Sequence, residues 1–95
     1  MYRTTINSYL ASLGALVAAY GIDAYPGHLV AVAHAAHAVV PAAAAVLTDT
    51  REPEIARLRA LAIASAAVLR DPAAARSLHA VLTQADPASA RAIAA

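Results

Sequence analysis

Histidines are the residues of this chain whose type and spacing come closest to a chemical site. His34 and His37 lie three residues apart, so in a helix their rings project from one face and could share a metal ion. His28 or His79 could complete the site, because a zinc ion takes three or four protein ligands. Carboxylates that would support such a site are scarce, since Asp23 is the only acidic residue among residues 1–48. The spacing therefore permits a metal or haem site without demanding one.

A simpler interpretation treats the two histidines as polar positions on an alanine-rich helix face or as residues of a contact between subunits. On a helical wheel, His34 and His37 project away from the apolar stripe of Leu29, Val32 and Val39. If they lie at a contact, their protonation below about pH 6 would place like charges there. Assembly is then expected to weaken in acid.

Other chemistries find little support in the sequence. The chain has no Cys, which excludes disulfides, thiolate metal sites and thiol catalysis. It contains no nucleophile elbow, no glycine-rich phosphate loop and no metalloprotease helix. These absences argue against an enzyme, and no cofactor is required.

Arginines are the remaining candidates for a binding patch. Arg57, Arg59, Arg70 and Arg76 could face an acidic partner, but acidic residues are interspersed and the first two point to different sides of a helix. We interpret them as a solvated face. With no Lys and a net charge of +1, the chain lacks the basic stripe that nucleic-acid binding requires, so a nucleic-acid partner is disfavoured.

The elements that must position these residues are helices. Apolar residues make up 61% of the chain and charged residues 14%, and alanine, the best helix former, supplies most of the apolar excess. Ninety-five residues suffice for one domain. We expect an all-α fold, a compact array of four to five short helices over residues 1–95, with the third and fourth helices as an antiparallel pair over the first two.

Capping residues and prolines divide the chain into these helices. Thr4 or Thr5 can cap a first helix over 5–20, and Gly21 can end it. A second helix is expected from 26 to 40, and Pro41 either kinks it or starts a new one. A third helix is expected to have Pro53 in its first turn. Asp-Pro pairs at 71–72 and 86–87 then open a fourth helix and a short fifth one.

Apolar residues at spacings of three and four predict which side of each helix faces the core. The expected inward residues are Ile6, Tyr9, Leu10, Leu13, Leu16, Val17 and Tyr20, then Leu29, Val32, Ala36, Val39 and Val40, then Ile55, Leu58, Leu61, Ala62, Ser65, Val68 and Leu69, and finally Leu78, Val81, Leu82 and Ala85.

Charge is distributed unevenly along the chain. Residues 1–48 contain two formal charges, whereas residues 49–95 contain the other eleven. Two successive helices without charged outer faces indicate that another surface covers both sides of them. We expect a non-enzymatic interaction or assembly module, working as a homo-oligomer or as a subunit of a complex. The expected interface residues are Ser8, Ser12, Gly14, Ala15, Ala19, His34 and His37.

Lipid is the alternative cover. Segments 5–22 and 28–48 could form a membrane hairpin followed by a helical tail, with arginines at one membrane surface. His34, His37 and Pro41 in mid-span argue against this arrangement. The start of the chain lacks the order of regions that marks a signal peptide, so a cytoplasmic protein is expected, with a membrane protein as the alternative.

Overall fold

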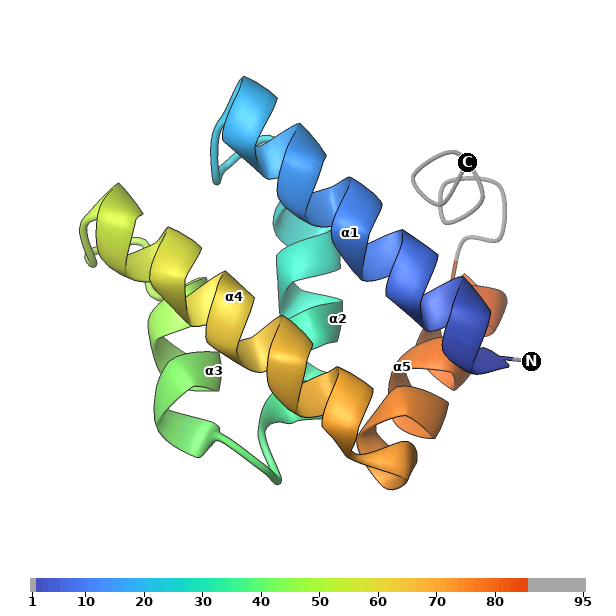
Figure 1. Cartoon of the computed structure of the whole chain (residues 1–95). Coiled ribbons are helices and arrows are strands. Elements are labelled where there is room, and N and C mark those ends of the chain that lie inside the picture. The colour runs from blue at the N-terminus through green and yellow to red at the C-terminus, as the bar shows by residue number, and fades with distance from the viewer. Residues whose placement is uncertain (1, 86–95) are drawn as a thin grey trace.

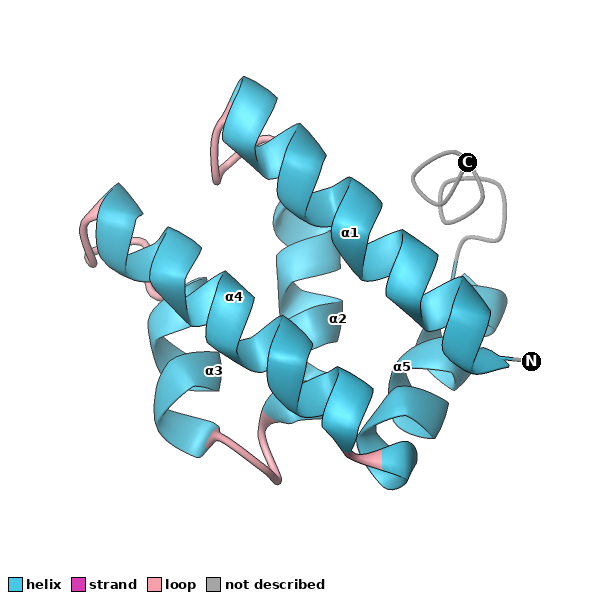
Figure 2. Ribbon diagram, in the orientation of Figure 1, coloured by secondary structure: helices cyan, strands magenta, loops and turns pink. Residues whose placement is uncertain are grey.

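The computed structural model describes residues 2–85, with side chains described for residues 4–83. All regular secondary structure in this range is helical (Figure 2). The helices are α1 (Tyr2–Tyr20), α2 (Pro26–Ala36), α3 (Pro41–Thr48), α4 (Glu54–Arg70) and α5 (Pro72–Ala85). The expected all-α array of short helices is confirmed, and the helix predicted after the second Asp-Pro pair lies outside the described residues.

The helices form two layers that cross each other (Figure 1). In the front layer of this view, α1 and α4 lie side by side and run in opposite directions. Behind them, α2 packs against α3, α4 and α5. The predicted third and fourth helices correspond to α4 and α5, and these two pack against each other and against both α1 and α2, as expected. The close neighbours of α1 are α4 and α5, because α4 lies alongside α1 while α2 crosses behind it.

Local sequence explains most of the helix boundaries. Gly21 ends α1 with a positive φ of 101°, and its N–H donates to the Val17 carbonyl at 2.8 Å, which satisfies one of the last carbonyls of the helix. At the other end α1 starts at Tyr2, three residues before the predicted start. Asp71 separates α4 from α5, and its carboxylate accepts a hydrogen bond from the Ala73 N–H at 3.0 Å.

Pro41 starts a new helix instead of kinking the second one. The predicted continuation of that helix to Val40 is wrong, because α2 ends at Ala36 and the chain turns before α3 begins at Pro41. Proline at the first helical position lacks an N–H that would have no partner there in any case. The turn reverses the chain, so α3 packs back against α2.

The core is built from aliphatic side chains and alanines. Ile6, Tyr9, Leu13, Val17, Leu29, Val32, Leu47, Val68 and Leu78 are fully buried. Four residues predicted to face inward are instead exposed: Tyr20, Val39, Ile55 and Ala62. Tyr20 is the last residue of α1, and Val39 lies in the turn after α2, outside any helix.

The other two exposed residues show that α4 is rotated from its predicted orientation. The residues of α4 that are buried are Arg57, Ala60, Leu61, Ala64, Ala67 and Val68. Alanines occupy half of this buried side, because small side chains let neighbouring helices approach α4 closely. Ile55 on the opposite side is 64% exposed.

The segment 28–48, which the membrane alternative treats as one span, is divided between α2, of 11 residues including Pro26 and Gly27, and α3, of 8 residues. Among the described residues, no helix combines the length and the apolarity needed to cross a membrane.

Candidate functional site

His34 and His37 are both exposed and share one groove. His34 lies in the last turn of α2, and His37 directly follows Ala36, the last residue of that helix. Together with Val30 they border a groove of about 300 Å³ whose other wall is α3, at Ala44, Ala45 and Thr48. The predicted metal pair is thus on one surface. Within the described residues, however, no three side chains of the metal-binding types lie close enough together to hold a metal ion.

His28 is engaged elsewhere, at the junction of α1 and α2. Its Nδ1 lies 2.7 Å from the hydroxyl of Tyr9, and the Tyr25 ring packs edge-on to it at a centroid distance of 6.3 Å. Burial raises the pKa of the Tyr9 phenol, so this hydroxyl keeps its proton. His28 therefore contributes to packing between the two helices, while His79 lies half-buried on α5.

The predicted interface residues fall on two separate surfaces. Ser8, Ala15 and Ala19 are exposed on the outer side of α1, and Ser12 and Gly14 beside them are half-buried. No heavy atom outside α1 lies within 4 Å of the position that a Cβ of Gly14 would occupy. His34 and His37 belong instead to the groove between α2 and α3. The sequence alone did not separate these two surfaces.

Arg57 is a buried structural residue, and its assignment to a solvated face is wrong. Its side chain is only 6% exposed. The Nε atom donates to the Leu47 carbonyl at 3.1 Å, and one terminal nitrogen donates to the Asp23 carboxylate at 2.8 Å. Leu47 lies in the last turn of α3, where carbonyls have no partner within the helix. Arg57 thus caps α3 and ties it to the loop between α1 and α2.

Glu54 completes this junction from the first turn of α4. Its carboxylate accepts a hydrogen bond from the backbone N–H of Ile22 at 3.3 Å. Glu54 and Arg57 therefore connect the charge-poor half of the chain to the charged half. Asp23, the acidic residue of the first half, serves as the partner of Arg57, although its side chain is 77% exposed.

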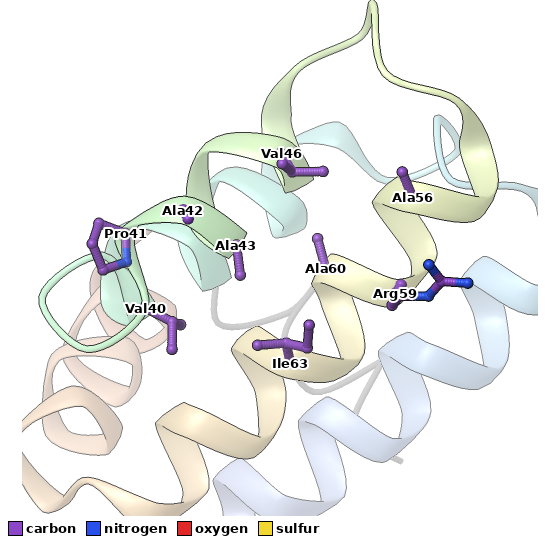
Figure 3. Close-up of a pocket in the computed structure, with 9 residues that line it drawn as sticks. All are labelled: Val40, Pro41, Ala42, Ala43, Val46, Ala56, Arg59, Ala60 and Ile63. Atoms are coloured by element: carbon purple, nitrogen blue, oxygen red, sulfur yellow. The ribbon is translucent and has the colours of Figure 1, made fainter.

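A second groove, between α3 and α4, was not anticipated from the sequence. It has a volume of about 450 Å³ and is open to solvent (Figure 3). Its lining residues are Val40, Pro41, Ala42, Ala43, Val46, Ala56, Arg59, Ala60 and Ile63. All of them are apolar except Arg59, whose guanidinium extends away from α3 in Figure 3. The only hint in the sequence was that Arg57 and Arg59 point to different sides of one helix.

The chain was compared with known protein families, with curated proteins and with solved structures, and none of them matches it.

Proposed function

We propose that this protein is a non-enzymatic helical interaction module that assembles with copies of itself or within a larger complex. The observation that supports this proposal best is the outer side of α1. Its exposed residues are Thr4, Thr5, Asn7, Ser8, Ala11, Ala15, Ala18 and Ala19, and none of them is charged. A helix in water usually carries charges on its outer side. Uncharged small residues along four turns are better suited to contact with another helix than to exposure to water.

Small side chains suit this role because they let two helix backbones come close together. On α1 the exposed alanines and Ser8 leave a smooth surface, and half-buried Gly14 adds a position with no side chain. A twofold dimer would bury the same strip of each subunit against the other. The compartment proposed for this assembly is the cytoplasm.

A charge placed in this strip tests the proposal. Ala15→Arg would put a guanidinium at the centre of the α1 contact, where it would lose water without gaining a partner. Size-exclusion chromatography with light scattering should show an oligomer for the unmodified chain and a monomer for Ala15→Arg. The matched control is Ala80→Arg, an exposed alanine in the middle of α5, which should leave the oligomer unchanged.

A monomer for the unmodified chain at high protein concentration would contradict self-assembly. An oligomer that withstands Ala15→Arg but dissociates with Ala80→Arg would move the contact away from α1. Circular dichroism of each variant checks that the helices remain folded.

A further inference from the structure

The groove between α3 and α4 exposes apolar surface that this fold leaves uncovered. Ile63 at its edge is 45% exposed, although alanines fill many of the outward positions of these helices. Val46 and Ala43 line it from α3, and Ala56 and Ala60 line it from α4 (Figure 3). Exposed aliphatic surface of this kind is stabilised when a partner covers it.

The length of the groove fits one side of a short helix. Its α4 side extends from Ala56 to Ile63, a rise of about 10 Å along the helix. The same rise separates residues i and i+7 of a partner helix, with i+4 between them on the same side. Because the groove is open to solvent, it would cover one side of a helix and leave the rest exposed. A small apolar ligand would usually be enclosed more completely.

The charge of Arg59 indicates which kind of helix would bind in the groove. Arg51 and Arg57 each pair with an aspartate, whereas no carboxylate of the described residues pairs with Arg59. The lining residues of the groove include no acidic side chain. Since the Arg59 guanidinium extends away from α3, a carboxylate would reach it from the flank of a bound helix and not from its centre (Figure 3).

We propose that the groove between α3 and α4 binds an amphipathic helix of another protein, one with apolar residues at i, i+4 and i+7 and a carboxylate on its α4 flank. This is the helix-in-groove mode of recognition, in which apolar side chains supply affinity and the flanking charge sets orientation. The site is distinct from the uncharged outer side of α1 and does not depend on self-assembly. A twofold contact of the groove with itself would bring a second Arg59 to the site where the proposal requires a carboxylate.

Two stapled helical peptides test this proposal on the full chain. Both carry leucines at i, i+4 and i+7, and they differ only in having glutamate or lysine on the flank. In ¹⁵N-labelled protein, the glutamate peptide should shift the amide resonances of Ala43, Val46, Ala56 and Ala60. The lysine peptide should bind about two- to fivefold more weakly, which is the contribution expected of one exposed ion pair.

Charge reversal identifies the residue responsible. Arg59→Glu should reverse the preference between the two peptides, while Arg70→Glu, an exposed position at the end of α4, should preserve it. Equal affinity of the two peptides, or an unchanged preference in Arg59→Glu, would overturn the proposal. So would concentration-dependent shifts of the groove resonances without peptide, because these would identify a second copy as the occupant. Light scattering of Ala15→Arg reports separately on assembly through α1.

Discussion

On one side of α4, Arg57 is enclosed and bonded to Leu47 and Asp23, whereas on the other side Arg59 borders an open apolar groove. The two arginines are two residues apart, which places them about 200° apart around the helix. One residue type thus has two different roles within a single turn. The surroundings, and not the side chain itself, therefore decide whether an arginine is structural or available to a partner.

Truncation of aliphatic residues on the two sides should give the largest difference. Leu61 is buried, so Leu61→Ala should lower the free energy of unfolding by about 3 kcal/mol, through lost burial and the cavity left behind. Ile63→Ala on the groove side should cost less than about 1 kcal/mol, because Ile63 is already half exposed to water. Urea unfolding followed by circular dichroism measures both. Equal losses would mean that the groove side belongs to the core.

Replacing the arginines should give a smaller difference in the same direction. Arg57→Met keeps much of the side-chain volume but leaves the Leu47 carbonyl without its charged donor, so we expect a loss of about 2 kcal/mol. Arg59→Met should change stability by less than about 0.5 kcal/mol. Thermal unfolding should show the difference clearly, because each kcal/mol lowers the Tm of a domain of this size by about 4 to 8 °C.

Asp23→Asn separates the two bonds of Arg57. Because the Asp23 side chain is largely exposed, its ion pair is screened by water and should contribute less than about 1 kcal/mol. If Asp23→Asn were as damaging as Arg57→Met, the ion pair and not the cap on α3 would be the main contribution of Arg57.

The two glycines, in the loop and inside α1, should give modest effects of opposite sign. Gly21→Ala, in the loop that Glu54 and Arg57 hold, forces an L side chain into a positive φ and should destabilise the fold by about 1 to 2 kcal/mol. Gly14→Ala lies inside α1 with open space at its Cβ, so it should stabilise the chain by up to about 1 kcal/mol. The two changes are compared by urea unfolding. A stabilising Gly21→Ala would show that the loop adjusts freely.

The sequence predicted the fold class and many of the boundaries, because these depend on local interactions. Alanine content favours helix, Gly21 ends α1, and Asp71 caps α5, and each of these effects acts within a few residues. The uncharged outer side of α1 was also visible, since it follows from helical periodicity alone. The role of His28 could not be predicted from the sequence, because its partner Tyr9 is 19 residues away.

The side of α4 that is buried depends on the neighbours that the fold brings to this helix. The hydrophobic stripe favoured Ile55 and Ala62, but alanines at 60, 64 and 67 allow closer packing, so α4 turns that side inward and carries Arg57 with it. Arg57 can be buried because Asp23 and Leu47, from two other segments, meet its nitrogens. The same rotation leaves Arg59 and Ile63 beside the groove. Sequence periodicity describes one helix at a time, whereas burial depends on the neighbours that the fold brings to it.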